Sequence, residues 1–248
     1  MLNGLDLFSG IGGLSSSLFP WVRTVAYCEN NRYAQAVLLS RMQTGELEVA
    51  PIWDDVRTIT GKMLPSVDII SAGFPCQDIS LMGTKTGLDG ERSKLFFEIT
   101  RLASELRPSF VFLENVPAIT LRGLDRICLE FTKIGYDCRW TVVSAAAIGA
   151  CHIRERWFLL AHANGMRLWE ERRTKDRNKP KSKRKILTND FSQPRRVTES
   201  SARTIEPRVV RTGDGIPCKV DRAHALGNAV VPLQARKAFK RLMGITGD

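Results

Sequence analysis

Three short motifs contain a thiol, a carboxyl group and two guanidinium groups that could act together on one substrate. Cys76 follows a Gly-Phe-Pro tripeptide, Glu114 precedes Asn-Val, and Arg154 and Arg156 lie two positions apart. Taken singly, a cysteine after a strand is usually structural, and a glutamate at a strand end is usually a solvated cap. A cysteine becomes a good nucleophile when its pKa is lowered, which nearby arginines can do. The combination therefore favours nucleophilic catalysis assisted by a carboxylic acid.

A second group of residues is typical of a nucleotide or cofactor site. A Phe-Ser-Gly-Ile-Gly-Gly run occupies positions 8–13, and Glu29 lies 19 positions beyond Gly10. Glycines permit a tight turn and close approach of a ligand, and an acidic residue at this distance can bind ribose hydroxyls. The G-x-G-G spacing is less favourable for a pyrophosphate than G-x-G-x-x-G. Taken alone, the run is equally compatible with a structural turn.

The elements that must position these residues alternate between strands and helices. Apolar runs predict strands, and each of the first four is followed by a candidate site residue or by the glycine run. Apolar residues at helical spacing predict helices between them. This alternation predicts an α/β fold with a doubly wound, mostly parallel sheet, whose ligands bind beyond the carboxyl ends of the strands. The predicted strands cover 5–8, 25–28, 67–72, 110–113, 140–145 and 157–161, and the helices begin after Asn30 or Asn31, cover 95–106 and 124–134, and follow Val231.

Composition narrows the class of protein. The chain has 248 residues, 43% of them hydrophobic, which is enough for a sizeable core. No apolar run reaches the ~18 residues of a membrane span, and the N-terminus does not resemble a signal peptide. The six cysteines form no C-x-x-C pair, so we expect neither a metal site nor a redox dithiol. A cytoplasmic protein with reduced cysteines is expected.

Positive charge is concentrated in one segment. The formal charge is +11, and residues 167–211 hold 15 Lys or Arg against 6 Asp or Glu, a net of +9. The densest part runs from Arg172 to Lys185. A basic run alone is more often a solvated linker than a nucleic-acid contact. The alternative is phosphate binding with release of counterions.

The motifs together resemble those of the DNA (cytosine-5) methyltransferases of bacteria and phages. The run from Asp6 to Gly13 is similar to the family's first motif, and Pro75-Cys76 resembles its nucleophile motif. Glu114-Asn115-Val116, the two arginines 154 and 156, and the segment 226–230 match three further motifs in the family's order. One departure is His152, where the family usually has Gln. It is expected either to contact DNA or to be a satisfied polar residue at a loop edge.

The resemblance implies a role for each matched residue. The cofactor would be S-adenosylmethionine in a Rossmann-like methyltransferase fold, and no metal is required. The implied catalytic residues are Cys76, Glu114, Arg154 and Arg156. The implied cofactor-binding residues are Phe8, Gly10, Gly12, Glu29, Asn30, Asp55, Val56, Pro75, Leu95, Asn228 and Val230, and the implied DNA-binding residues are Gln77, Ser80, His152, Arg195, Arg196, Arg208 and Arg211.

The resemblance also divides the chain and assigns a reaction. Residues 1–163 would bind cofactor and catalyse, 164–218 would form a small, basic target-recognition region, and 219–248 would return to the catalytic domain. Within the basic region, 172–185 is either an insert or a phosphate contact, and 189–217 would read the target. The Cys76 thiolate would attack C6 of a flipped-out cytosine, C5 would take the methyl group, and protonated Glu114 would bind N3.

Three other functions share some of these features. A transfer-RNA cytosine-5 methyltransferase would use the same catalytic residues, and the basic segment does not exclude RNA. A catalytically inactive DNA-binding relative is disfavoured because Cys76, Glu114 and Arg156 are all present. A nicotinamide-dependent oxidoreductase would explain the glycine run and Glu29 but not the other motifs. The expected partner is double-stranded DNA, bound by a monomer outside any membrane, with a cognate restriction endonuclease as a possible genetic partner.

Overall fold

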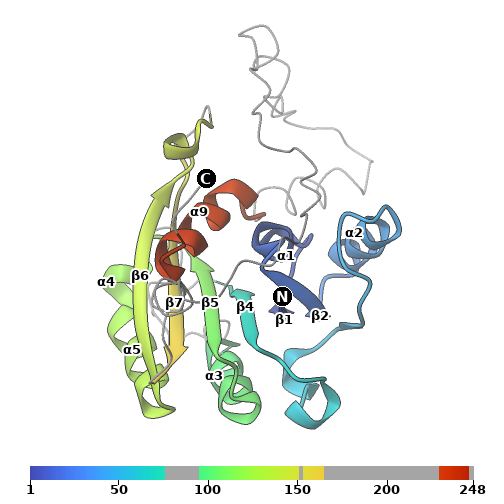
Figure 1. The fold of residues 1–248 in the computed structure, drawn as a ribbon, viewed down its shortest axis with the longest axis horizontal. Coiled ribbons are helices and arrows are strands. Elements are labelled where there is room, and N and C mark those ends of the chain that lie inside the picture. The colour runs from blue at the N-terminus through green and yellow to red at the C-terminus, as the bar shows by residue number, and fades with distance from the viewer. Residues whose placement is uncertain (76–94, 151–152, 165–228, 246–248) are drawn as a thin grey trace, which may run out of the picture.

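A seven-stranded sheet forms the centre of the molecule. The computed structural model describes residues 1–75, 95–150, 153–164 and 229–245. The strand order is β3-β2-β1-β4-β5-β7-β6 (Figure 1). The strands are β1 (Leu2–Leu7), β2 (Val22–Cys28), β3 (Ile52–Trp53), β4 (Ile69–Gly73), β5 (Phe110–Asn115), β6 (Tyr136–Ser144) and β7 (Glu155–Ala163).

The directions of the strands determine which residues lie together at one edge of the sheet. The strands β1 to β5 pair in parallel, whereas β7 pairs antiparallel with both β5 and β6. The carboxyl ends of β1, β2, β4 and β5 therefore share one edge with the beginning of β7. In the ladder, Asn115 lies opposite Trp157 and Glu114 opposite Phe158. The predicted doubly wound, mostly parallel sheet is confirmed, with β7 as the antiparallel strand.

Helices cover both faces of the sheet. On one face, α3 (Leu95–Leu106) and α5 (Leu124–Lys133) pack through Phe96, Ile99 and Phe131 into the larger apolar cluster. On the other face, α1 (Gly13–Leu18) and α9 (Pro232–Met243) pack through Leu14 and Phe239. Figure 1 shows α9 crossing in front of β7 and β5. A third cluster joins α2 (Arg32–Gln43) to Tyr27 of β2.

Local signals explain where the predicted helices begin and end. Asn31 caps α2, because its side chain accepts a hydrogen bond from the amide of Ala34 at 3.0 Å. The helix α3 ends at Leu106, two residues before Pro108, and α5 ends just before Gly135, which has a φ of 83°. These predicted boundaries are confirmed to within one or two residues.

Short elements escaped prediction because their sequences carry weak local signals. The helix α1 contains three serines and begins at a glycine, so its formation depends on burial of Leu14 and Leu18 rather than on helix propensity. The strand β3 has only two residues. The helix α4 (Ile119–Arg122) and the 3-10 turns η1 (Val56–Thr58), η2 (Gly61–Met63) and η4 (Ala146–Ile148) are equally short.

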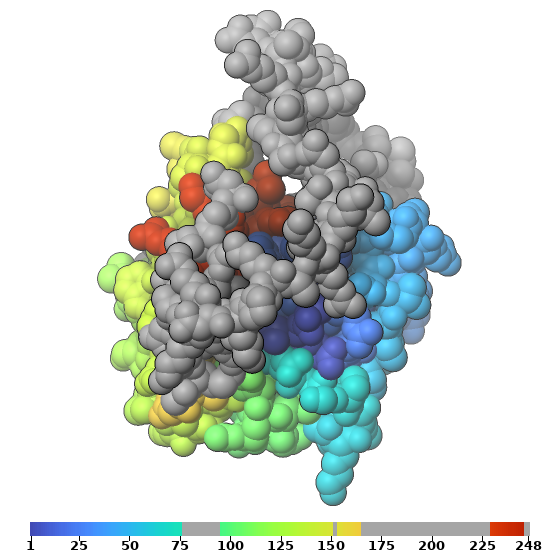
Figure 2. Space-filling model, viewed as in Figure 1, coloured from blue at the N-terminus to red at the C-terminus, as the bar shows by residue number. Residues whose placement is uncertain are grey.

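The C-terminal helix α9 packs against segments that lie far from it in the sequence. Its surface lies between those of the N-terminal segment and β6 (Figure 2). Ala235, Ala238 and Phe239 are fully buried against the sheet. Among the residues described, no helix is both long enough and apolar enough to cross a membrane.

Candidate active site

A buried carboxyl–guanidinium pair lies at the carboxyl edge of β5. Glu114 Oε1 is 2.9 Å from Nε of Arg156, and the side chains are only 11% and 18% exposed. Glu114 is the penultimate residue of β5, and Arg156 is the second residue of the adjacent β7. Antiparallel pairing therefore brings together two motifs that lie 42 positions apart in the sequence. Two residues of the implied catalytic set, the acid and one arginine, are thus adjacent in the structure.

Burial makes Glu114 a weak acid. Loss of hydration raises the pKa of its carboxyl group from 4.5 to about 7, although the charges of Arg156 and Arg154 and the hydrogen bond from Arg156 oppose this rise. Burial also lowers the pKa of the Arg154 guanidinium, and the neighbouring charge of Arg156 adds to that effect. At neutral pH, Glu114 can therefore exist in either protonation state and can donate or accept a proton.

The segment that leads into the nucleophile motif is held by the residue after Glu114. The side-chain amide of Asn115 donates a hydrogen bond to the carbonyl oxygen of Phe74 at 3.2 Å, and its Oδ1 accepts one from the amide of Val116 at 2.8 Å. Phe74 is buried and packs against Phe96 with ring centroids 5.6 Å apart. Pro75, a predicted cofactor contact, follows at once. The backbone before Cys76 is thus fixed relative to Glu114.

Arg154 is directed toward the C-terminal segment. Its Nη2 donates a hydrogen bond to the carbonyl oxygen of Ala229 at 2.9 Å, and its own carbonyl oxygen accepts from the amide of Ala145 at 3.0 Å. The residue is partly buried, and its charge acts on the pKa of Glu114. Arg154 therefore interacts electrostatically with Glu114 and Arg156.

The glycine run after β1 forms a rigid turn. Phe8 has a φ of 55°, a conformation that is strained for a residue with a side chain. Ser9 holds the turn, because its hydroxyl donates to the carbonyl oxygens of Asp6 and Cys28 at 2.7 and 3.2 Å. A Cβ atom built at Gly10 would meet no atom of the described residues within 4 Å. The turn therefore presents open space at Gly10, in which a ligand can approach the backbone.

Glu29 closes this turn from the end of β2. One carboxylate oxygen accepts a hydrogen bond from the amide of Gly10 at 2.7 Å, and the other accepts from the amide of Asn31 at 2.8 Å. Glu29 is only 9% exposed. Each carboxylate oxygen can accept more than one hydrogen bond, so Glu29 can brace the turn and still bind hydroxyl groups. Asn30, its predicted neighbour in cofactor binding, is exposed.

The predicted cofactor-binding residues Asp55 and Val56 follow β3. Asp55 caps η1 and forms a bidentate pair with Arg57, whose Nε and Nη2 lie 2.9 and 2.8 Å from its two oxygens. Hydrogen bonds from Arg57 hold the pKa of Asp55 below its ordinary value. Val56 is buried in the main apolar cluster, and Leu95, at the start of α3, packs against the same cluster. Val56 and Leu95 thus pack in the same apolar cluster, and Asp55 is the residue before Val56.

Two glycines of the run have little room for a side chain. A Cβ atom at Gly12 would lie 2.5 Å from a methyl carbon of Leu47, and one at Gly13 would lie 3.2 Å from Cβ of Val230. The second contact also involves the backbone of Val230, so the two segments meet almost backbone to backbone. The first and last motifs of the sequence are therefore adjacent. Contact of Gly12 and Val230 with a cofactor stays a prediction.

A buried polar network beneath the glycine run was missed by sequence reasoning. Asp6 is 1% exposed and accepts hydrogen bonds from the hydroxyls of Ser15 and Ser71, at 2.5 and 2.7 Å. Burial raises its pKa to about 6. The network ties β1 to α1 and β4, so it fixes the turn that lies between them. The sequence did contain one signal for this network, because the charged Asp6 lies between two leucines of a predicted strand.

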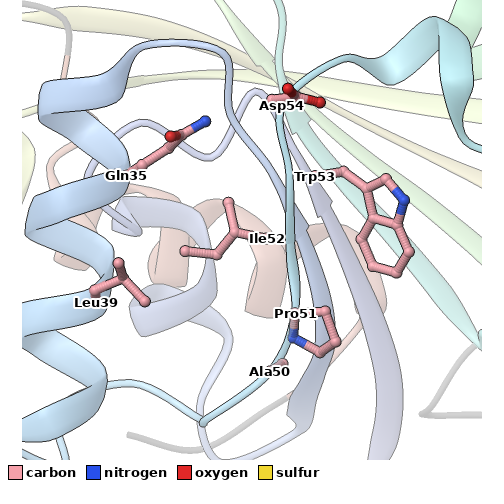
Figure 3. A pocket seen from close by; sticks show the side chains of 7 residues that line it. All are labelled: Gln35, Leu39, Ala50, Pro51, Ile52, Trp53 and Asp54. Carbon is pink, nitrogen blue, oxygen red and sulfur yellow. The ribbon is translucent and has the colours of Figure 1, made fainter.

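An open hollow lies between α2 and β3. Its volume is about 630 Å³, and Gln35 and Leu39 of α2 face Ile52 across it (Figure 3). The side chain of Trp53 points to the other side of the strand, as strand alternation requires. Gln35 also donates a hydrogen bond to the carbonyl oxygen of Glu29. The hollow thus adjoins the end of β2 without including the acid–guanidinium pair.

Several predicted site residues lie outside the described residues. These are the nucleophile, the two residues expected to contact DNA close after it, the histidine before the arginine motif, four arginines of the basic segment and one cofactor contact. They are Cys76, Gln77, Ser80, His152, Arg195, Arg196, Arg208, Arg211 and Asn228.

The sequence matches one protein family and several of its members. The family model for C-5 cytosine-specific DNA methylase matches residues 2–212. The type II methyltransferase M.CviJI of Paramecium bursaria Chlorella virus IL3A is 38% identical over 159 residues, covering 63% of this chain and 42% of that protein. M.HhaI of Haemophilus parahaemolyticus is 31% identical over 172 residues, covering 67% and 51%. The chain spans about half the length of the curated relatives that it matches.

Solved structures agree in fold. A DNA modification methyltransferase encoded within an E. coli prophage is similar with a TM-score of 0.54 and 25% identity, over 68% of this chain and 48% of that one. The Entamoeba histolytica methyltransferase EhMeth has a TM-score of 0.55 at 20% identity, over 68% and 55%. At that identity the second likeness concerns the fold alone. The matched residues include the glycine run, the acid motif and the arginine motif, and this chain belongs to the C-5 cytosine-specific DNA methylase family.

Proposed function

We propose that this chain transfers a methyl group from S-adenosylmethionine to C5 of a cytosine in double-stranded DNA. The observation that carries the proposal is the buried Glu114 carboxyl group, which has a pKa of about 7 and pairs with Arg156. Asn115 connects this pair to the segment that enters Cys76. Family membership supports the same chemistry.

The residues at the edge of β1 and β2 suit the proposed methyl donor. The open space at Gly10 allows close approach to the backbone, and the carboxylate of Glu29 can accept hydrogen bonds from ribose hydroxyls. Asp55 and Val56 would hold the adenine end, and Phe8, Pro75 and Leu95 would supply apolar contacts. When bound, S-adenosylmethionine would supply a methyl group activated by its sulfonium charge.

The residues of the chain would make the base reactive. The Cys76 thiolate would form a bond with C6 of the cytosine, which places electron density on C5 and N3. Protonated Glu114 would donate a hydrogen bond to N3, and Arg156 would hold Glu114 in place. C5 would then accept the methyl group, and the electron pair of the broken sulfur–methyl bond would stay with the donor, which would leave as neutral S-adenosylhomocysteine. A base would remove the C5 proton, and Cys76 would leave as the thiolate.

The substrate must be presented as an extruded base. Neither C6 nor N3 of a stacked, paired cytosine is accessible to a thiol and a carboxyl group, so the nucleotide must leave the duplex. We propose that the basic region 164–218 binds the surrounding DNA, since it carries most of the net positive charge. Arg195, Arg196, Arg208 and Arg211 would contact bases, and the run 172–185 would contact phosphates.

One assay separates the proposal from its alternatives. The purified chain is incubated with methyl-labelled S-adenosylmethionine and either double-stranded DNA or transfer RNA, and Cys76→Ala serves as the matched control. We expect label in DNA only, none with the variant, and a covalent adduct between wild type and DNA containing 5-fluorocytosine. Label in RNA alone would support the RNA alternative. Equal labelling of DNA by Cys76→Ala would remove the cysteine from the mechanism.

Further expectations depend on this proposal. A monomeric state, a cytoplasmic location and association with a restriction endonuclease stay predictions. The recognised DNA sequence can be read by bisulfite sequencing of DNA from cells that express the chain.

A further inference from the structure

The C-terminal segment 229–234 holds Arg154 at both its side chain and its backbone. The carbonyl oxygen of Ala229 accepts a hydrogen bond from Nη2 of Arg154 at 2.9 Å. Five residues later, Nε2 of Gln234 donates to the carbonyl oxygen of Arg154 at 2.6 Å. Two contacts from the segment 229–234 therefore hold one arginine of the catalytic motif, whose carbonyl oxygen also accepts from the amide of Ala145 at 3.0 Å.

The side chain of Gln234 joins two backbone segments by hydrogen bonds. It is fully buried in the first turn of α9, and its Nε2 also donates to the carbonyl oxygen of Val143 in β6, at 2.5 Å. A single amide group thereby joins the end of β6 to the residue that precedes β7. Burial of a polar side chain is costly unless its hydrogen bonds are formed. The amide nitrogen of Gln234 donates twice, whereas its buried Oε1 accepts no hydrogen bond among the described residues. Apolar packing alone would anchor α9, as Ala235, Ala238 and Phe239 do, so packing does not explain this glutamine.

The hydrogen bond to Arg154 is two residues away from the acid–guanidinium pair. Arg156 is the second residue of β7, and Arg154 just before the strand continues the pairing with β6, because its carbonyl oxygen accepts from the amide of Ala145. Side chains at i and i+2 of such paired backbone leave the same face. Arg156 in turn lies 2.9 Å from Glu114. A shift in the backbone at Arg154 would therefore move both guanidinium groups relative to the carboxyl group. Among the described residues, Arg154 and Arg156 are the charged groups that act on the ionisation of Glu114.

We propose that Gln234 is a positioning residue, which sets the placement of Arg154 and Arg156 against Glu114 through its hydrogen bond to the Arg154 backbone. Its relevance to methyl transfer rests on the proposed function. Gln234 itself would touch neither the base nor the cofactor. A purely structural anchor would affect only the stability of the fold.

The test measures the ionisation of Glu114 directly. Side-chain carboxyl carbons of glutamate are labelled with ¹³C and titrated by NMR in the cofactor-free protein, and Glu114→Gln assigns the signal. Gln234→Leu removes both donated hydrogen bonds at similar volume. Lys237→Met is the matched control, because Lys237 lies three residues later in α9 and donates from an exposed side chain to the carbonyl oxygen of Ala147 at 3.0 Å.

We expect Gln234→Leu to raise the pKa of Glu114 by about 1, since a displaced guanidinium stabilises the carboxylate less. Lys237→Met should leave this pKa unchanged. Gln234→Asn keeps the buried amide but shortens it by one methylene, so it should fold and give a smaller rise in the same direction. An unchanged pKa of Glu114 in both Gln234 variants would overturn the inference, whatever happens to stability.

Activity then tests the catalytic part of the inference separately. With DNA as substrate, Gln234→Leu should lower kcat by roughly 10- to 100-fold, the scale of small misplacements in an active site. The alkaline limb of its pH profile should move upward with the pKa of Glu114. Wild-type kcat and an unchanged limb in an active enzyme would refute a positioning role but leave the proposed function standing. Absence of DNA methylation by wild type would refute the proposed function, and the NMR titration would still decide the geometric inference.

Discussion

Replacement of Glu114 by glutamine should remove a pH dependence of folding stability that the buried carboxyl group causes. Burial raises the pKa of this group from 4.5 to about 7 in the folded state. A folded-state pKa above the unfolded value means that the native protein holds the proton more tightly. Stability is therefore greatest below the unfolded pKa and falls as pH rises through the folded pKa.

The size of the effect follows from the two pKa values. A pKa change of one corresponds to about 1.4 kcal/mol, so ionisation of Glu114 should cost roughly 3 kcal/mol of unfolding free energy between pH 4 and pH 8. Glutamine has nearly the same shape but no proton to lose in this range. The unfolding free energy of wild type minus that of Glu114→Gln should thus fall by roughly 3 kcal/mol over this interval. Contributions from other groups, including the buried Asp6, cancel in the difference.

Urea denaturation at several pH values measures this difference. Glu105→Gln is a control of opposite sign, because hydrogen bonds from Gly61 and Arg101 hold the pKa of Glu105 below its ordinary value. Its contribution should be lost as the pH falls below the ordinary glutamate range, with no change between pH 5 and 8. A wild-type minus Glu114→Gln difference that stays constant from pH 4 to 8 would refute the argument, since Glu114 would then ionise like an exposed carboxyl group. Methyl transfer by Glu114→Gln should fall by roughly 10²- to 10⁴-fold, the range for loss of a general acid.

Three further predictions concern the cofactor side, the packing of the first motif and the basic region. Glu29→Ala should weaken S-adenosylmethionine binding by roughly 1–3 kcal/mol in calorimetry, because a charged acceptor is lost; unchanged affinity would place the donor elsewhere. Gly13→Ala should lower the unfolding free energy by roughly 1–3 kcal/mol, since its Cβ would lie 3.2 Å from Cβ of Val230. Gly45→Ser, whose Cβ would meet no described residue within 4 Å, should be strained only by its positive φ. Neutralising several charges in 172–185 should flatten the log–log salt dependence of DNA binding by roughly 0.9 per lost phosphate contact without altering the methylated sequence. A changed sequence with an unaltered slope would mean that this run reads bases.

The strand and helix pattern of the catalytic part could be predicted because its local signals are strong. Apolar runs such as 110–113 and helical spacing such as 95–106 report burial directly, and Asn31, Pro108 and Gly135 mark boundaries through their own backbone chemistry. Short elements could not be predicted in this way. The helix α1 forms because one face of it is buried, and the two-residue strand β3 forms because it pairs with β2. Neither cause can be seen in the local sequence of the segment.

The types and order of the candidate catalytic residues were determined by the sequence alone. A cysteine after Pro75, an acid at 114 and arginines at 154 and 156 indicate one chemistry wherever they lie in space. Their family follows from the same motifs. The ionisation of the acid does not, because a pKa of about 7 depends on burial by the rest of the sheet.

Tertiary structure alone decided which residues support that chemistry. The antiparallel direction of β7 brings Arg156 to Glu114, and neither the motif nor its spacing specifies that direction. Asn115 contacts Phe74 across 41 positions, and Gln234 contacts Arg154 across 80. A polar residue that bonds to a distant backbone carbonyl leaves no periodic trace in its own segment, because its partner is a group that every residue carries. For that reason the sequence determined what the site contains, whereas the fold determined how its members are held and charged.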